Sequence, residues 1–309
     1  FQASGLPVLP HFGFSGANLL PTITTLITMT GGTMFAIWLG ELISEYGIRN
    51  QGLSLIIFSG IVSRLPNSVG QLWSDEQTRY AGLALFLALV AITVFAIVVV
   101  TQGRRNVPVM YPGRRIGRRQ SMPVRGSLPL LVNMAGMIPI IFASAILSFP
   151  AILAQFFTGS QAQWVRNIAL GMQDLFANQQ NWGYITIYFF MVVLFAFFYT
   201  DVLFQQQNYG ENLKRVGAQV PGVTKGAPTQ RYLNKVLRRI TLPGATLLGT
   251  VAVLPLLVGA MFLGVTGGGN AFFAIGSGLL IVVGVVKETF FGLETELKLR
   301  GYDDSLLVH

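Results

Sequence analysis

Cysteine is absent from this sequence, and histidine occurs only twice among its 309 residues, as His11 and His309. Without cysteine the chain can form neither a disulfide nor a Cys-ligated metal centre. The two histidines stand near opposite ends of the sequence and cannot by themselves build a multi-histidine site. These absences exclude disulfide scaffolds and the common zinc centres, and we expect no bound metal or cofactor.

Charged residues are also scarce. Only 11% of the residues are charged, 52% are hydrophobic, and the mean hydropathy is +0.59. Soluble domains carry about 25% charged residues, so much of this surface must face lipid rather than water. Acids are scarcer than bases, 12 against 21, which gives a net charge of +9. The excess of positive charge predicts anionic partners: lipid headgroups, RNA or an acidic protein surface.

Long apolar segments dominate what remains. Seven are predicted to span a membrane, at residues 20–43, 52–73, 81–102, 130–157, 184–204, 241–263 and 271–291. A spanning helix needs about 20 residues, whereas barrel strands would alternate over about 10 residues. The sequence therefore predicts an all-α polytopic membrane protein. Between residues 155 and 183 it also predicts a small surface helix, because Trp164 and Trp182 are typical of a membrane interface.

The basic residues lie almost entirely on one side of the predicted spans. All but three of the 21 Lys and Arg residues fall there, and the exceptions are Arg64, Arg79 and Arg166. The positive-inside rule then places the basic loops and the C-terminus in the cytoplasm. The chain would start outside, at Phe1 and without a signal sequence, so we expect further spans upstream and hence a fragment.

The segment 103–129 carries the densest positive charge. Between Gly103 and Gly126 it holds seven arginines and no acid. Arginine forks suit phosphates and carboxylates, and a cluster of positive charge also attracts anionic lipids. We therefore predict that this loop contacts rRNA phosphates, an acidic protein surface or lipid headgroups.

Two other functions have weaker support in the sequence. The GFSG sequence at residues 13–16 matches the GxSG pattern of intramembrane serine proteases, but it precedes the first span, and a turn is favoured. A secondary transporter normally places charge or broken helices at the bilayer midplane. Here the candidate acids, Asp201 and Glu288, lie near the cytoplasmic ends of their helices. We expect a protein that is not an enzyme, with a small-solute transporter as the alternative.

Four stretches of the sequence are specific enough to indicate a family: Gly32–Val62, Leu128–Leu153, Glu211–Val223 and Leu297–Tyr302. They resemble the SecY family, the central subunit of the protein-conducting channel. The resemblance implies ten spanning helices in two pseudosymmetric halves, of which seven lie in this sequence. Residues 20–43 would be the fourth helix and residues 271–291 the tenth; the missing three would carry the plug and one side of the lateral gate.

The same resemblance implies a division of the chain. Residues 1–102 would end the N-terminal half, and residues 103–129 would form a basic cytoplasmic loop. Residues 130–309 would form the C-terminal half, with a cytoplasmic loop at 205–240 and a cytoplasmic tail at 293–309. The function implied is a channel for secretion of unfolded polypeptides across the bacterial cytoplasmic membrane and for insertion of membrane proteins into it.

The resemblance also implies two sites within the membrane. An apolar pore ring would be formed by Leu53, Ile57, Ile141 and Ile281. Branched aliphatic side chains offer water no hydrogen bonds, so a narrow ring of them dewets and blocks ions. A lateral gate for signal sequences would include Asn133, Phe149 and the helix at 184–204. Asn133 would hydrogen-bond across the closed gate, or alternatively cap the start of its helix.

The implied partners contact the cytoplasmic loops and the membrane-embedded surface. The loops 103–129 and 205–240 would dock the ribosome, through rRNA, or the SecA ATPase, using Arg104, Arg105, Arg114, Arg115, Arg118, Arg119, Lys225 and Arg231. The SecE and SecG small subunits, signal sequences, nascent polypeptides and anionic lipids complete the expected set. One position departs from the family pattern: Thr224 stands where an arginine is usual, beside Lys225, which keeps the charge but not the fork.

Overall fold

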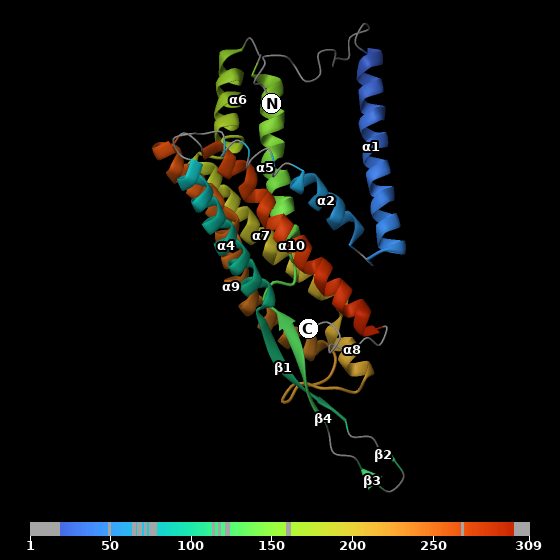
Figure 1. The fold of residues 1–309 in the computed structure, drawn as a ribbon. Coiled ribbons are helices and arrows are strands. Elements are labelled where there is room, and N and C mark those ends of the chain that lie inside the picture. The colour runs from blue at the N-terminus through green and yellow to red at the C-terminus, as the bar shows by residue number, and fades with distance from the viewer. Residues whose placement is uncertain are drawn as a thin grey trace. The chain divides into compact units, whose positions relative to one another are not determined.

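The computed structural model describes residues 19–48, 51–63, 66, 70, 73, 79–112, 115–116, 119–120, 124–158, 162–266 and 269–299 (Figure 1). The chain divides into two compact units. The first comprises Phe1–Gly60 and Val285–His309, and the second comprises Ile61–Gly284. The first unit therefore holds the start of the described chain together with the last part of its C-terminal helix, and the second holds everything between.

Two helices of the first unit meet at a pair of glycines. These helices are α1 (Leu19–Tyr46) and α2 (Gly52–Val62), and the last part of α10 (Gly269–Leu299) belongs to the same unit. A Cβ placed on Gly52 would collide with the carbonyl of Gly40, so the two backbones touch. The amide of Gly52 donates to Ser44 Oγ at 3.0 Å. Glycine is required here because no side chain fits between the helices.

The second unit is a helix bundle. Its long helices are α4 (Arg79–Gln102), α5 (Ile138–Phe157), α7 (Trp182–Gln207) and α9 (Ala227–Thr266). Helix α7 packs along α9, with α5 against α7 and α4 against α9. Tyr188 and Val192 of α7 and Leu248 of α9 are almost fully buried in this core. The outward faces keep large apolar side chains exposed, as lipid-facing helices do.

The expected membrane class is confirmed, whereas the number of spans stays a prediction. Five helices in the described part of the chain are long and apolar enough to cross a membrane. The expected span 52–73 is described continuously only as far as Ser63, and α2 ends at Val62. The expected span 271–291 lies within α10, which continues to Leu299 and so includes part of the expected tail.

One predicted boundary in the C-terminal half was wrong. The span expected at 130–157 begins only at Ile138, because residues up to Leu131 belong to a strand. The span expected at 241–263 is the apolar part of a longer helix that begins at Ala227. Hydropathy marks the portion of a helix that suits lipid and cannot locate an end that lies in water.

The basic loop expected at 103–129 contains a β-ribbon, which the all-α prediction did not include. Strand β1 (Arg104–Tyr111) pairs antiparallel with β4 (Val124–Leu131), with Arg104 opposite Leu131 and Tyr111 opposite Val124. Beyond them, β2 (Arg115–Ile116) pairs with β3 (Arg119–Gln120). Val107 and Val109 are buried while Asn106 and Pro108 are exposed, which is the period of two that a half-buried strand shows.

The small surface helix expected between residues 155 and 183 is confirmed as α6 (Gln163–Phe176). Its side chains are mostly exposed, including Trp164. In Figure 1, α6 lies beside the C-terminal end of α5, at the opposite end of the second unit from the ribbon. The ribbon and α6 therefore mark the two ends of this bundle.

Candidate functional site

The two basic loops of the sequence form one folded body, which we call the ribbon module. It consists of β1, β4, α8 (Tyr209–Arg215), residues 216–226 and the first turns of α9. Its parts share one apolar core. The buried side chains of this core are those of Val107, Val109, Leu130, Phe204, Leu213, Ala218, Val220, Leu233, Leu237 and Ile240. A partner that binds this module thus meets one surface built from both loops.

A backbone pairing joins the two loops directly. The amide of Met110 donates to the carbonyl of Gln219 at 2.8 Å, and the amide of Gln219 donates back to Met110 at 2.9 Å. This antiparallel bridge adds a short extended segment to the edge of β1. It fixes the loop that follows α8 against the ribbon.

The tip of the second loop is held by local hydrogen bonds. The hydroxyl of Thr229 donates to the carbonyl of Thr224 at 2.8 Å, and the side chain of Gln230 accepts from the amide of Gly210 at 2.7 Å. Gly222 has φ +80°, a conformation that favours glycine. Thr224 and Lys225 are exposed on this ordered turn, so the departure from the family pattern lies on the surface.

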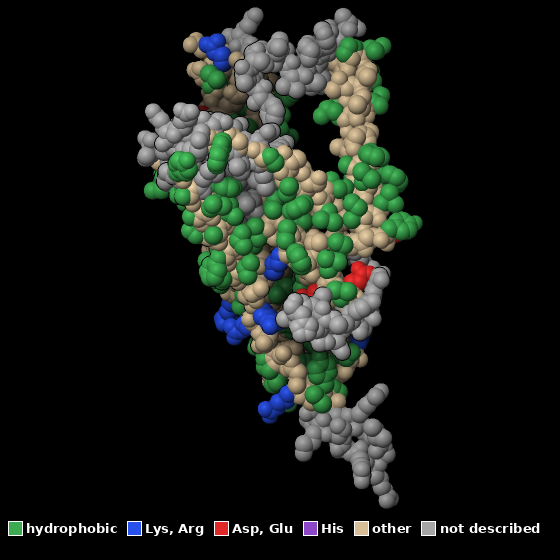
Figure 2. Space-filling view, in the orientation of Figure 1, with side chains coloured by type: hydrophobic (Ala, Val, Ile, Leu, Met, Phe, Trp, Pro, Cys, Tyr) green, Lys and Arg blue, Asp and Glu red, His purple; other side chains and the backbone are tan. Residues whose placement is uncertain are grey.

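Most of the predicted docking residues in the described chain are exposed on this module. Arg104, Arg105, Lys225 and Arg231 are all exposed. Arg115 and Arg119 lie on β2 and β3, and Arg114 and Arg118 lie outside the described residues. In Figure 2 most of the visible Lys and Arg side chains gather near the end of the bundle from which the ribbon projects. The docking role itself stays a prediction.

The four predicted ring residues lie on three helices. Leu53 and Ile57 are one turn apart on α2 and are 56% and 41% exposed. Ile141 on α5 and Ile281 on α10 are half-buried and belong to the second unit, whereas Leu53 and Ile57 belong to the first. The ring of four stays a prediction.

Within the second unit, two glycines of α10 lie close to other side chains. A Cβ on Gly284 would collide with the side chain of Met137, which immediately precedes α5. A Cβ on Gly278 would lie 2.7 Å from Ile61, near the end of α2. Ile281 stands midway between these two glycines in the sequence. A side chain at either glycine would have to displace the side chain that it meets, so glycine suits both positions.

The predicted gate residues have clear local environments. Asn133 is buried, and its Nδ2 donates to the carbonyl of Gly136 at 3.0 Å. Gly136 has φ +62°, so Asn133 closes the turn that leads into α5. The N-cap of α5 is Met137, which makes no side-chain cap bond, so the alternative of an Asn133 helix cap is wrong. Phe149 is 62% exposed on α5, and its gate role stays a prediction.

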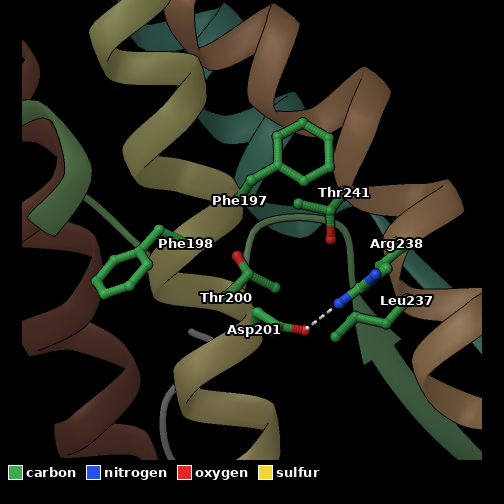
Figure 3. Close-up of a pocket in the computed structure, with 7 residues that line it drawn as sticks. All are labelled: Phe197, Phe198, Thr200, Asp201, Leu237, Arg238 and Thr241. Carbon is green, nitrogen blue, oxygen red and sulfur yellow. Dashed lines mark hydrogen bonds and ion pairs between the residues drawn. The ribbon is translucent and has the colours of Figure 1, made fainter. Parts of the chain in front are cut away.

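Asp201, one of the two acids considered for an ion path, is paired near the ribbon end of α7. Its Oδ1 lies 3.4 Å from Nη2 of Arg238 on α9, and its Oδ2 accepts from Gln205 at 2.8 Å (Figure 3). Sequence reasoning missed this partner, which lies 37 residues away in the chain. In the described residues no three His, Cys, Asp or Glu side chains are grouped so as to hold a metal ion.

Comparison with known proteins gives consistent matches. A family model described as SecY matches residues 1–290. "Protein translocase subunit SecY" of Streptomyces scabiei is 40% identical over 298 residues, which cover 94% of this chain and 64% of that protein. The Streptomyces coelicolor protein of the same name is 38% identical over 325 residues, covering 99% of this chain and 71% of its own length. The corresponding Chlamydia trachomatis protein is 35% identical over 309 residues, covering 97% and 66%.

Two solved structures share the fold. One is described as "The structure of a protein conducting channel" and matches with a TM-score of 0.56 and 17% identity, covering 86% of this chain and 63% of that one. A second, on the plug domain of the SecY protein, matches with a TM-score of 0.55 and 18% identity, covering 86% and 64%. The chain thus spans about 64% of the length of the Streptomyces scabiei relative that it matches.

Proposed function

The chain belongs to the SecY family, and from that premise we propose that it forms part of a channel that moves unfolded polypeptides across, or into, the bacterial cytoplasmic membrane. It is a multi-pass membrane protein with the fold of the protein-conducting channel. Its relatives are named translocase subunits, which points to a channel rather than an enzyme. The same names give no support to a small-solute transporter.

The observation that carries this proposal is the set of branched aliphatic side chains at the predicted ring positions of α2, α5 and α10. Within the second unit, Gly278 and Gly284, which flank Ile281 in the sequence, lie close to Ile61 and Met137. A constriction formed by such side chains would exclude ions by dewetting, yet it would form no specific bond with a passing chain. That combination suits a channel for polypeptides of any sequence.

The ribbon module supports the proposal for partners. A translocating channel needs a source of energy, and SecA or a translating ribosome would dock on the exposed arginines and lysines of this module. The orientation with the module in the cytoplasm follows from its excess of positive charge. SecE and SecG would complete the complex in the membrane, and signal sequences would enter beside α5 and α7.

A chimaeric channel tests the proposal. Residues 1–309 would replace the matching segment of the Streptomyces scabiei relative, and the product would be reconstituted with SecE, SecG and SecA in proteoliposomes. We expect ATP-dependent protection of a secretory preprotein from external protease. A chimaera that assembles with SecE but protects no preprotein, while the unmodified relative does, would overturn the proposal.

A further inference from the structure

A shallow pocket of about 390 Å³ lies between α7 and α9, within the second unit (Figure 3). Phe197, Phe198 and Leu237 form its apolar wall. Four polar side chains complete the lining: Thr200, Asp201, Arg238 and Thr241. The proposed path of a polypeptide does not use this pocket. The pocket combines one apolar wall with a group of hydrogen-bonding side chains.

Thr241 carries an unpartnered hydroxyl in this pocket. The residue is only 3% exposed, and its Oγ1 has no hydrogen-bond partner among the described residues. Figure 3 shows this oxygen pointing from α9 into the space between the two helices. A buried hydroxyl without a partner is unfavourable, and a ligand oxygen that accepts its hydrogen bond would remove that cost.

Arg238 has donors to spare for such a ligand. Among the described residues, the guanidinium donates only through Nη2, to Asp201 at a long 3.4 Å. A guanidinium has five N–H donors in a planar fork, which matches the oxygens of a phosphate. Asp201 is itself held by Gln205, so it can orient the guanidinium of Arg238, which lines the pocket. The next residue, Arg239, adds a second exposed positive charge.

The pocket lies where the apolar runs of both helices end. No charged residue occurs in α7 before Asp201, and none occurs in α9 after Arg239. This is the level at which a spanning helix meets the phosphates of the bilayer. Phe198, which also lines the pocket, is 61% exposed, and its ring extends from α7 on the side away from α9, where an acyl chain would lie (Figure 3). A ligand that fits must therefore carry an anionic head and an apolar tail.

We propose that this pocket binds one anionic phospholipid, with Arg238 and Thr241 donating to its phosphate oxygens and Phe198 contacting its acyl chain. The site is distinct from the diffuse attraction that any basic loop exerts on an acidic membrane. It goes beyond the proposed channel function and does not depend on it.

The test counts lipids retained by the purified 309-residue chain in neutral detergent. Phosphatidylglycerol or phosphatidylcholine is titrated, and bound lipid is measured by native mass spectrometry. The variants are Arg238→Gln, Thr241→Val and Phe198→Ala. The matched control is Arg239→Gln, which removes an exposed charge from the adjacent residue that does not line the pocket. Thr241→Ser keeps the hydroxyl and serves as the rescue variant.

We expect one phosphatidylglycerol to be retained in preference to phosphatidylcholine. Arg238→Gln should weaken its binding by about tenfold or more, and Thr241→Val by about threefold to tenfold, since a hydrogen bond to a charged group is lost in each. Thr241→Val removes an unsatisfied buried group, so it should not lower the unfolding temperature. Arg239→Gln and Thr241→Ser should bind nearly as the wild type does.

Three results would overturn the site. Equal weakening by Arg239→Gln and Arg238→Gln would mean that only diffuse charge attracts the lipid. Equal retention of phosphatidylcholine would mean that the phosphate charge is not recognised. Displacement of the lipid by an equal concentration of inorganic phosphate, with no effect of Phe198→Ala, would mean that the pocket takes a free anion instead.

Discussion

Replacing Leu233 by alanine should loosen the ribbon module and leave the spanning bundle intact. Leu233 is 0% exposed and lies in the core shared by α8, α9 and the ribbon. Truncating a buried leucine to alanine costs about 2–5 kcal/mol, because apolar contacts are lost and a cavity remains. The bundle has its own core, centred on residues such as Val192, and that core does not include Leu233.

Hydrogen exchange can measure this loss of stability in the ribbon module. The amides of Met110 and Gln219 are protected by the bridge between the two loops, and they exchange when the module opens. A loss of about 2–5 kcal/mol corresponds to exchange that is roughly 30-fold to a few thousand-fold faster. The matched control is Tyr232→Ala, since the adjacent Tyr232 is 41% exposed. Its effect on the exchange of both amides should be small.

Exchange measured by mass spectrometry, on peptides covering each loop and α7, decides the outcome. The account requires the two loop peptides to lose protection together while the peptide around Val192 keeps it. If only one loop responds, the module is not a single body. If all three peptides respond equally, the module and the bundle unfold as one unit, and the separation of their cores is wrong.

Three further predictions concern packing, charge and the constriction. Gly284→Ala should lower the unfolding temperature, because the new Cβ collides with Met137. The control, Gly171→Ala, lies in open space on α6 and should leave the unfolding temperature unchanged or raise it. Equal changes in the unfolding temperature of the two variants would refute the close contact. Glutamine substitution of the four arginines at 114, 115, 118 and 119 should flatten the salt dependence of ribosome or SecA binding by about two to four units of log–log slope. Identical binding of the wild type and this variant in neutral detergent would refute a docking role. In the chimaeric channel, Ile57→Asn or Ile281→Asn should hydrate the constriction and raise ion conductance in planar bilayers, and unchanged conductance in both would remove the ring assignment.

The helical membrane class could be predicted from the sequence because lipid imposes a strong local pattern. A long apolar run such as 81–102 favours a spanning helix in lipid, and the structure has helix α4 over these residues. The start of α9 could not be found in this way. From Ala227 to Ile240 the helix is amphipathic: Leu233 and Leu237 face the module core, while Arg238 is exposed. A period of 3.6 residues, rather than hydropathy, was the signal that could have revealed it.

The ribbon was missed for a different reason. Val107 and Val109 are two residues apart and both buried, but Pro108 stands between them, and proline argues against a central strand. A two-stranded ribbon consists of edges, where a proline is tolerated. The bridge from Met110 to Gln219 could not be predicted from sequence at all, since it joins residues that lie far apart in the chain. Such pairings depend on tertiary packing and leave no local pattern.

Cross-linking to an arrested polypeptide is the most direct test of the central claim. A photoreactive amino acid at Ile281 of the chimaeric channel would be activated while a preprotein is stalled in transit. The control position is Phe95, which is 71% exposed on α4, a helix outside the proposed gate. The account predicts a strong cross-link from position 281 to the preprotein, dependent on SecA and ATP, and little from position 95. A cross-link of equal strength at both positions, or none at 281 while translocation proceeds, would contradict the claim that polypeptide passes this constriction.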